Sequence, residues 1–226
     1  MALALGNDIF DNLKKDKRFQ VFITRDDGGY TKDFSDYFNN HMSEIKTFKE
    51  DAKKKMAEKV KTGTFVTKPN GYHISVKEPV ALKLYGLNKW ENENDIDVVI
   101  HIHFNDDGRK NKSKPGKYSG FSVYMPDSQL ASGSLSAPLA LNIFKELKKK
   151  YNSATNSKIN GGVISDQKLI VMGANGTLSS SVRTILIEYG FIYEKQFRTY
   201  TSRKTAFQNR ADITASAIVD YFFPKK

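Results

Sequence analysis

The sequence predicts an α/β fold: an open, mostly parallel, twisted sheet with helices on both faces. Segments of β-branched and apolar residues alternate along the chain with segments whose apolar residues recur at helical spacing. One of them, residues 97–104, is almost continuously apolar, which is typical of a strand buried on both faces. A chain of 226 residues can bury one substantial core, so we expect a single domain over residues 1–226.

The expected helices are the segments in which apolar residues form one stripe. They span residues 3–13, 33–61, 79–90, 136–151 and 202–222, and the second is one long helix or a helix pair. The stretch from about residue 31 to residue 77 is rich in Lys and Glu. We interpret residues 31–77 as a charged helical insert within the domain.

The expected strands are short runs of β-branched, aromatic and apolar residues. They span residues 20–25, 97–104, 121–125, 169–172 and 184–189, and residues 71–76 fit a short strand or a loop. The order of these elements along the chain, with helices between most strands, is the basis for expecting helices on both faces of the sheet.

Composition narrows the possible functions. The 36 basic residues exceed the 25 acidic ones, and the net charge of +11 favours association with polyanions such as nucleic acid, teichoic acid or anionic lipid. No stretch approaches the roughly 20 apolar residues of a membrane span. Cysteine is absent, which excludes disulfides and thiolate metal sites, so any metal must be bound by histidine and carboxylate.

His101 and His103 form the first candidate site. Residues two apart in a strand point to the same side, so both imidazoles share one face. The polar segment 105–108 ends the strand directly afterwards, and open α/β sheets place their ligand crevices at such carboxyl ends. The pair could therefore bind a metal, although spacing alone fits core or hydrogen-bonded histidines equally well. We interpret His41 and His73 as surface or capping residues.

Glu188 is the second candidate. It stands within the apolar run of residues 185–191, where a carboxylate is costly unless it is paired, protonated or bound to a metal. The alternatives are an outward position on an edge strand or a structural salt bridge. If its strand runs parallel to residues 97–104, Glu188 can meet the His101/His103 pair at one end of the sheet. A metal-bound water beside such a carboxylate is equipped to hydrolyse an amide.

Other chemistries find less support. The serines at 179–181 lack the Gly-x-Ser-x-Gly turn of serine hydrolases, and the glycine-containing stretches 27–29 and 160–162 show no phosphate-binding pattern. The lysine-rich runs are typical of solvated helix ends and turns.

Taken in order, these motifs resemble the zinc-dependent N-acetylmuramoyl-L-alanine amidase family. Residues 2–25 are similar to its helix followed by a strand ending in Thr-Arg, and residues 101–105 (HIHFN) are similar to its Ser-Ile-His-Ala-Asn strand. Residues 186–191 (LIEYGF) are similar to its late Leu-x-Glu-x-Gly-Phe strand. The resemblance covers most of the chain apart from the insert.

The resemblance implies a peptidoglycan hydrolase that cuts the amide between N-acetylmuramic acid and L-alanine. It makes His103 a ligand of Zn²⁺ and Glu188 the catalytic carboxylate that activates the zinc-bound water. His101 occupies a serine position of the family, so the resemblance gives it no ligand role, whereas strand geometry leaves one open. The substrate implies an extracytoplasmic protein, either secreted, periplasmic or in the cell wall, whose export signal would lie in a missing N-terminal part. Substrate-binding residues are not identified.

The chain also departs from the family pattern. The His-Gly-Gly motif of the family's first strand and a glutamate ligand before its first helix have no counterpart here, and no capping residue precedes residues 3–13. We therefore expect an N-terminally truncated amidase that lacks the first strand, two zinc ligands and the export signal. The insert, residues 31–77, is hypothesised to cover the edge of the active site and to gate access or dock a partner.

Two other classes remain open. A non-catalytic cell-wall-binding module would keep the fold and lose zinc, which fits a chain that retains only His103 and Glu188 of the family's site. A nucleic-acid binder is motivated by the charge of +11 alone, without a recognition motif, so no specific nucleic acid is expected. The basic surface suits anionic wall polymers equally well.

Overall fold

A four-stranded sheet lies at the centre of the molecule. The computed structural model describes residues 1–68, 76–156 and 162–224. The strands, in spatial order, are β3 (Val98–Asn105), β6 (Arg183–Phe191), β4 (Ser122–Pro126) and β5 (Val163–Asp166). β3 is parallel to β6 and β4 to β5, whereas β4 and β6 are antiparallel. The expected α/β class, with an open and mostly parallel sheet, is confirmed.

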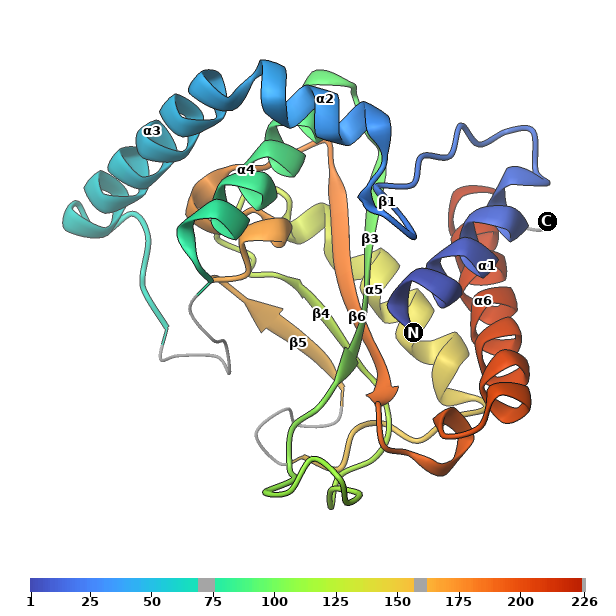
Figure 1. The fold of residues 1–226 in the computed structure, drawn as a ribbon. Helices are drawn as coiled ribbons and strands as arrows, with labels where there is room; N and C mark the ends of the chain where they lie inside the picture. The colour runs from blue at the N-terminus through green and yellow to red at the C-terminus, as the bar shows by residue number, and fades with distance from the viewer. Residues whose placement is uncertain (69–75, 157–161, 225–226) are drawn as a thin grey trace.

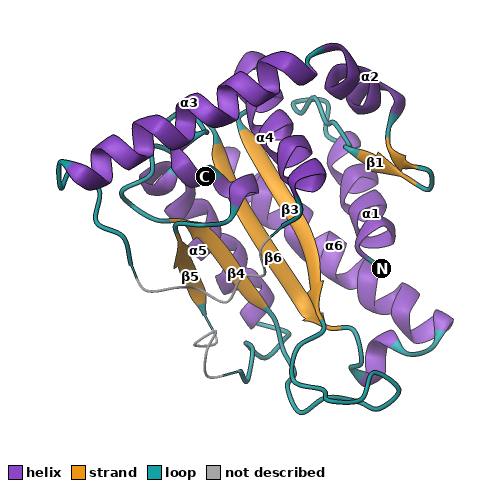
Figure 2. Cartoon of the chain, turned by 60° about the vertical axis from the view of Figure 1, so that its left-hand side comes forward, coloured by secondary structure: helices purple, strands orange, loops and turns teal. Residues whose placement is uncertain are grey.

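Helices cover both faces of the sheet (Figures 1 and 2). One face carries α1 (Ala2–Lys14), α5 (Gly133–Lys148) and α6 (Tyr200–Phe222). The main core lies here, because alternate residues of the strands, such as Ile102 and Ile187, point to these helices. The opposite face carries α4 (Glu78–Glu93) and the 3₁₀ turn η1 (Ile170–Met172).

The insert forms two helices on the outer side of α4. They are α2 (Lys32–Asn40) and α3 (Met42–Lys61), so the expected helical segment is a helix pair. Phe38 and Ile45 of this pair pack with Tyr85 of α4 in a separate apolar cluster. Gly86 permits the close approach, since a Cβ at this position would lie 2.9 Å from both Phe38 Cε1 and Ile45 Cδ1.

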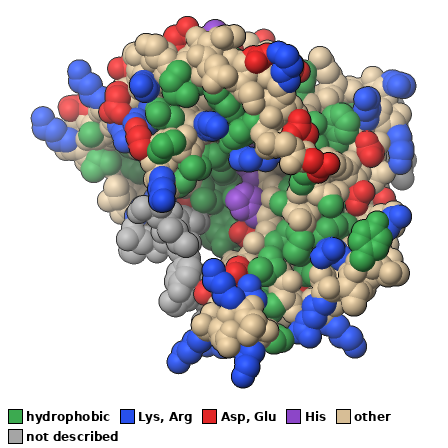
Figure 3. Space-filling model, in the orientation of Figure 1, with side chains coloured by type: hydrophobic (Ala, Val, Ile, Leu, Met, Phe, Trp, Pro, Cys, Tyr) green, Lys and Arg blue, Asp and Glu red, His purple; other side chains and the backbone are tan. Residues whose placement is uncertain are grey.

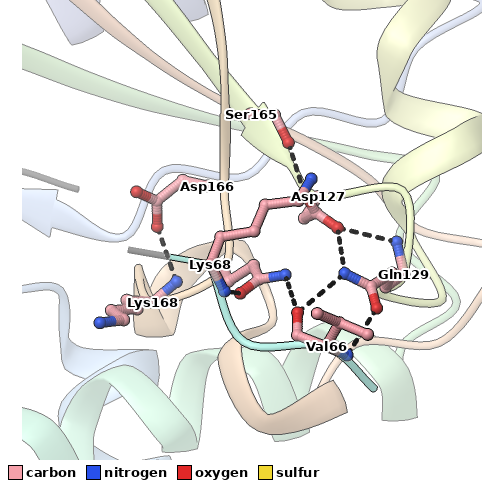
Figure 4. Close-up of polar contacts among 8 residues, drawn as sticks. Val66, Lys68, Asp127, Gln129, Ser165, Asp166 and Lys168 are labelled. Carbon is pink, nitrogen blue, oxygen red and sulfur yellow. Dashed lines mark hydrogen bonds and ion pairs between the residues drawn. The ribbon is translucent and has the colours of Figure 1, made fainter. Parts of the chain in front are cut away.

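Two glutamine side chains fasten the chain segment that leaves α3 (Figure 4). Gln129 accepts a hydrogen bond from the Val66 backbone N–H at 2.8 Å and donates to the Val66 carbonyl at 3.1 Å. Gln167 donates to the same carbonyl and accepts from the Lys68 backbone N–H. Lys68 also forms an ion pair with the buried Asp127. The segment 65–68, here called the strap, is therefore tied to the ends of β4 and β5.

The strand expected at residues 20–25 is wrong. Only its last residue is in a strand, in the short hairpin of β1 (Arg25–Asp26) and β2 (Gly29–Tyr30). In the described part of the chain, the outer edge of β3 pairs with no strand, so the preceding residues have no ladder to join. β-branched composition favours a strand only where a neighbour supplies the hydrogen bonds.

The strand expected at residues 169–172 is also wrong, because these residues form η1. The Asp166 carboxylate accepts hydrogen bonds from the backbone N–H groups of Lys168 and Leu169, which turns the chain before η1. Gly173 then ends it with φ of 82°. The edge strand is β5 instead. The expectation for residues 71–76 falls almost wholly on residues 69–75, outside the described ranges.

The remaining expected elements are confirmed with shifts at their ends. These are α1, α4, β3, β4, α5, β6 and α6. In addition, short 3₁₀ turns occur at η2 (Ala174–Gly176) and η3 (Lys195–Phe197). None of the helices within the described ranges combines the length and apolar composition needed to cross a bilayer.

Candidate active site

His103 and Glu188 face each other across two parallel strands. β3 and β6 pair so that His103 is the register partner of Glu188. The distance from His103 Nδ1 to Glu188 Oε1 is 4.0 Å. Both side chains point away from the main core. The residue before each of them, Ile102 or Ile187, packs in that core, and successive side chains of a strand point to opposite faces. The parallel pairing that the sequence analysis required for this meeting is therefore present.

Glu188 is the most unusual group of the pair. Its side chain is 17% exposed, and Oε2 is buried without a hydrogen-bond partner among the described residues. Burial raises the pKa of Glu188 to about 7. A carboxylate that gains and loses its proton near neutral pH is suited to general acid–base chemistry.

His103 is the more accessible of the two, with 53% of its side chain exposed. We call the space in front of the His103–Glu188 pair, on the face of the sheet away from the main core, the hollow. Figure 3 shows a concave region near the centre of the view, with a histidine side chain on its floor and basic and acidic side chains beside it. Partial burial, followed by the positive charge of Arg25, lowers the pKa of the imidazole. A neutral imidazole keeps a lone pair that can bind a metal ion.

His101 lies deeper on the same strand face. Burial lowers its pKa to about 3, and the ring forms a hydrogen bond with the backbone of Val171 in η1. Its Nε2 is buried and has no hydrogen-bond partner in the described residues. This is the environment of a neutral histidine packed under η1, and the structure does not bring its Nε2 into an ion pair with Glu188.

β4 adds residues that the sequence analysis did not identify. Ser122 is the antiparallel partner of Glu188, and Tyr124 is the partner of Leu186, so both belong to the face of the site. Burial, and then the charge of Glu188, raises the pKa of Tyr124 to about 12. Arg25 was also missed as a site residue. Only the pairing of β4 with β6 reveals Ser122 and Tyr124, because nothing in their local sequence marks them, whereas Arg25 is the arginine of the Thr-Arg segment that ends residues 2–25.

A catalytic zinc site requires about three protein ligands. His103 and Glu188 supply two donors in the hollow. Throughout the described ranges, no group of three or more His, Cys, Asp or Glu side chains is placed to hold a metal ion. These residues therefore do not complete a zinc site by themselves. His41 lies at the junction of α2 and α3 and contacts Glu44, whereas His73 is outside the described residues.

Comparison with known proteins places this fold. The chain is similar to an N-acetylmuramoyl-L-alanine amidase from Clostridium difficile 630, with a TM-score of 0.57 and 17% identity over 99% of this chain and 83% of that one. It is also similar to the catalytic domain of the amidase CwlV from Bacillus (Paenibacillus) polymyxa var. colistinus, with a TM-score of 0.55, 16% identity and the same coverage of 99% and 83%. At these identities the two structures establish the fold alone.

The family is established by the sequence itself. No curated protein gave a match. A family model described as N-acetylmuramoyl-L-alanine amidase matches residues 1–220, which is nearly the whole chain and includes both residues of the hollow. The chain therefore belongs to the N-acetylmuramoyl-L-alanine amidase family.

Proposed function

We propose that this protein hydrolyses the amide bond between N-acetylmuramic acid and L-alanine in peptidoglycan. The observation that carries the proposal is the pairing of His103 with Glu188 in an open hollow, 4.0 Å apart, within a fold that belongs to the amidase family. One member of the pair is buried and proton-active near neutral pH, and the other is accessible and neutral.

Glu188 is the proposed catalytic residue. In its ionised form, Oε1 faces the hollow and accepts a proton from the attacking water, which is the work of a general base. The protonated carboxyl then returns that proton to the leaving nitrogen of L-alanine. Because its pKa is about 7, Glu188 can perform both transfers at neutral pH.

His103 is the proposed ligand of Zn²⁺. When bound, the ion would lower the pKa of a coordinated water and polarise the substrate carbonyl. The described residues do not complete its site, so further ligands would have to come from outside these ranges. His101 remains a weaker candidate, because its ring is packed beneath η1.

The surface beside the hollow suits a polyanionic cell wall. The loop that follows β3 contains Lys110, Lys112 and Lys114, which are exposed and form no ion pair with described residues, whereas Arg109 pairs with Asp106. We propose that this loop holds anionic wall polymers by long-range attraction. Peptidoglycan as substrate places the proposed site of action outside the cytoplasm, which requires a route of export.

A second candidate function is a cell-wall-binding module without catalysis. The observation that favours it is the incomplete donor set, since only His103 and Glu188 meet in the hollow. Such a module would hold peptidoglycan in the same hollow and leave its amide bonds intact.

Zinc analysis of the purified 226-residue chain separates the two functions. For the hydrolase we expect about one zinc per chain, lost in His103→Ala and retained in Glu188→Gln. Digested peptidoglycan should release stem peptides with a free L-alanine amine, and Glu188→Gln should not release them. His41→Ala is the matched control, because this histidine lies between α2 and α3.

Binding to peptidoglycan without zinc and without release of peptides would favour the wall-binding module. Retention of zinc by His103→Ala would overturn the ligand assignment, whatever the activity.

A further inference from the structure

Two basic segments leave the sheet side by side, at the lower end of the sheet in Figure 1. β3 ends at Asn105 and β6 at Phe191, which are register partners, and the Asn105 carbonyl accepts a hydrogen bond from the Ile192 backbone N–H at 2.9 Å. The loop that follows β3 therefore starts beside the segment that leads from β6 to η3. His103 and Glu188 lie two and three residues before these strand ends, so both segments start next to the hollow.

Tyr193 joins the two segments. Its hydroxyl donates a hydrogen bond to the Asp107 carbonyl in the loop at 2.6 Å. The guanidinium carbon of Arg109, also in the loop, lies 5.6 Å from the centre of the Tyr193 ring, and this side chain donates to the Lys112 carbonyl. Arg198, which follows η3, donates from Nε to the Tyr193 carbonyl at 3.0 Å. The loop and η3 therefore form one continuous surface.

The acidic side chains of this surface are engaged within the protein. Asp106 forms an ion pair with Arg109. Asp107 Oδ2 accepts a hydrogen bond from Asn156 Nδ2 at 3.1 Å. Glu194 Oε1 accepts from two backbone N–H groups, at 2.7 and 3.1 Å. None of these carboxylates forms an ion pair with a lysine among the described residues.

Four lysines of this surface have no such engagement. Lys110, Lys112 and Lys114 are exposed in the loop, and Lys195 is exposed at the start of η3. Their ammonium groups form no hydrogen bond or ion pair with a described residue. We call these four lysines the basic rim. Because no internal contact depends on the ammonium groups, their removal should cost little stability.

We propose that the basic rim binds a phosphodiester polymer of the cell wall and holds it beside the hollow. This inference rests on the proposed function. An ammonium group on a flexible stem binds phosphate as a point charge, so four of them can follow the phosphates of a flexible chain. Each phosphate that a lysine neutralises releases counterions, which favours binding. The polymer is then fixed at the ends of the strands that carry His103 and Glu188, beyond the long-range attraction of the loop.

The aromatic side chains around the rim argue against nucleic acid as the occupant. Sites for single-stranded nucleic acid combine basic groups with several rings on which successive bases stack. Tyr193 is only 7% exposed, and Tyr118 is partly buried with Lys117 Nζ 4.9 Å from its ring centre. Of the described tyrosines near the rim, Tyr200 alone is open, with 73% exposure. A single open ring does not stack a series of bases, so a polymer without bases fits better.

The binding test uses a synthetic glycerol phosphate oligomer of about ten units. Calorimetric titration at two salt concentrations measures its binding to the intact chain and to three variants. The loop variant combines Lys110→Gln, Lys112→Gln and Lys114→Gln, and the second variant is Lys195→Gln. The control combines Lys53→Gln, Lys54→Gln and Lys55→Gln in α3, where three exposed lysines also form no ion pair with described residues. The loop variant and the control lose the same charge.

We expect the loop variant to bind the oligomer about tenfold more weakly, and its dependence of log affinity on log salt to fall by about 2, since three lost phosphate contacts contribute roughly 0.7 each. Lys195→Gln should weaken binding by a smaller factor, and the control should bind like the intact chain. Equal weakening in the loop variant and the control would overturn the inference, because net charge alone would then explain binding. Tighter binding of a single-stranded DNA of the same charge, lost in Tyr200→Ala, would overturn it in favour of nucleic acid.

Cleavage assays separate this inference from the proposed function. With zinc supplied, the intact chain and the control should cleave peptidoglycan that carries its phosphodiester polymer faster than peptidoglycan stripped of it. The loop variant should lose this difference. Cleavage of both walls without binding of the oligomer would overturn the role of the rim and keep the hydrolase. Binding with the expected losses, but cleavage of neither wall, would overturn the hydrolase and keep the rim, and absence of both would overturn both.

Discussion

His103 and Glu188 are register partners on adjacent parallel strands, with Nδ1 and Oε1 4.0 Å apart. This pairing gives each residue a different environment, since Glu188 is mostly buried and His103 is half-exposed. The carboxyl is therefore the group whose protonation the fold controls, and the imidazole is the group that the solvent reaches.

Replacement of Glu188 by Gln should lower the rate of amide cleavage by roughly 10²–10⁴-fold, the usual contribution of a positioned acid or base. Gln has nearly the same shape and cannot ionise, so the fold should be kept. The measurement is the rate at which stem peptides with a free L-alanine amine are released from peptidoglycan. Glu194→Gln is a control, because that carboxylate accepts from the Phe191 and Gly120 N–H groups and lies outside the hollow. A Glu188→Gln protein with full activity would remove Glu188 from the mechanism.

Glu91 should make the protein less stable as the pH rises. It is 4% exposed on α4, its Oε2 has no partner in the described residues, and burial raises its pKa to about 8. Because the folded pKa exceeds the unfolded value of 4.5, the protonated form is favoured by folding. The contribution of protonated Glu91 to the free energy of unfolding is fully present below pH 4.5. It is lost progressively up to about pH 8, by at most about 1.4 kcal/mol per pH unit.

Denaturant unfolding at pH 5 and pH 8 tests this dependence. Glu91→Gln should flatten the difference between the two pH values and be the more stable protein at pH 8. Glu93→Gln, on the same helix but at the surface, should keep the difference. If all three proteins lose stability equally between pH 5 and pH 8, the carboxyl of Glu91 is not responsible.

Asp127 should control the attachment of the strap. Asp127 is 1% exposed, and burial alone would raise its pKa. Hydrogen bonds from Lys68, the Gln129 backbone and Ser165 outweigh burial and hold the pKa of Asp127 below its usual value. Asp127→Asn should cost roughly 1–3 kcal/mol, as for loss of a hydrogen-bonded charge. The stability that ionised Asp127 gives to the folded protein is present above about pH 3.8, the usual pKa of the group. It is lost as the pH falls, because the pKa in the folded state is depressed.

Hydrogen exchange of residues 65–68 is the direct readout. It should be faster in Asp127→Asn than in the unmodified chain at neutral pH, with a smaller difference in acid. Lys68→Gln, which removes the other partner of the ion pair, should act in the same direction. Protection of the strap in both variants would show that the hydrogen bonds of Gln129 and Gln167 suffice. A change in peptidoglycan cleavage on strap release would support gating by the insert.

Gly86→Ala should loosen the insert. The new Cβ would lie 2.9 Å from the Phe38 ring and the Ile45 side chain, and such overpacking costs about 1–3 kcal/mol. Gly6→Ala is a matched control in another helix, because its Cβ would meet only Ile102 Cδ1 at 3.4 Å. Since Ala is the better helix former by about 1 kcal/mol, that variant should be neutral or more stable. Thermal unfolding compares them, and equal melting temperatures would contradict the proposed contact.

The local sequence was sufficient to predict an element where its own pattern of apolar residues shows which face is buried. The apolar runs of β3 and β6 and the stripe of α5 are examples, and the placement of His103 beside Glu188 followed from two such strands. The prediction from sequence failed where a neighbouring strand decides whether a segment becomes a strand. Residues 20–25 have strand composition but no neighbouring strand among the described residues, and the short, partly polar β5 is a strand only because β4 lies beside it. Tyr124 reaches the site through the pairing of β4 with β6, which composition does not encode.

The outer edge of β3 carries a further consequence. Within the described ranges β3 pairs with β6 alone, so alternate backbone N–H and C=O groups along its other side have no sheet neighbour. Such an edge is a template on which an extended segment of another molecule can add. Any segment that adds there lies next to His103 on the side opposite Glu188, and every second side chain that it brings is directed to the same face. A second molecule that pairs with this edge of β3 would therefore interfere with substrate binding at His103.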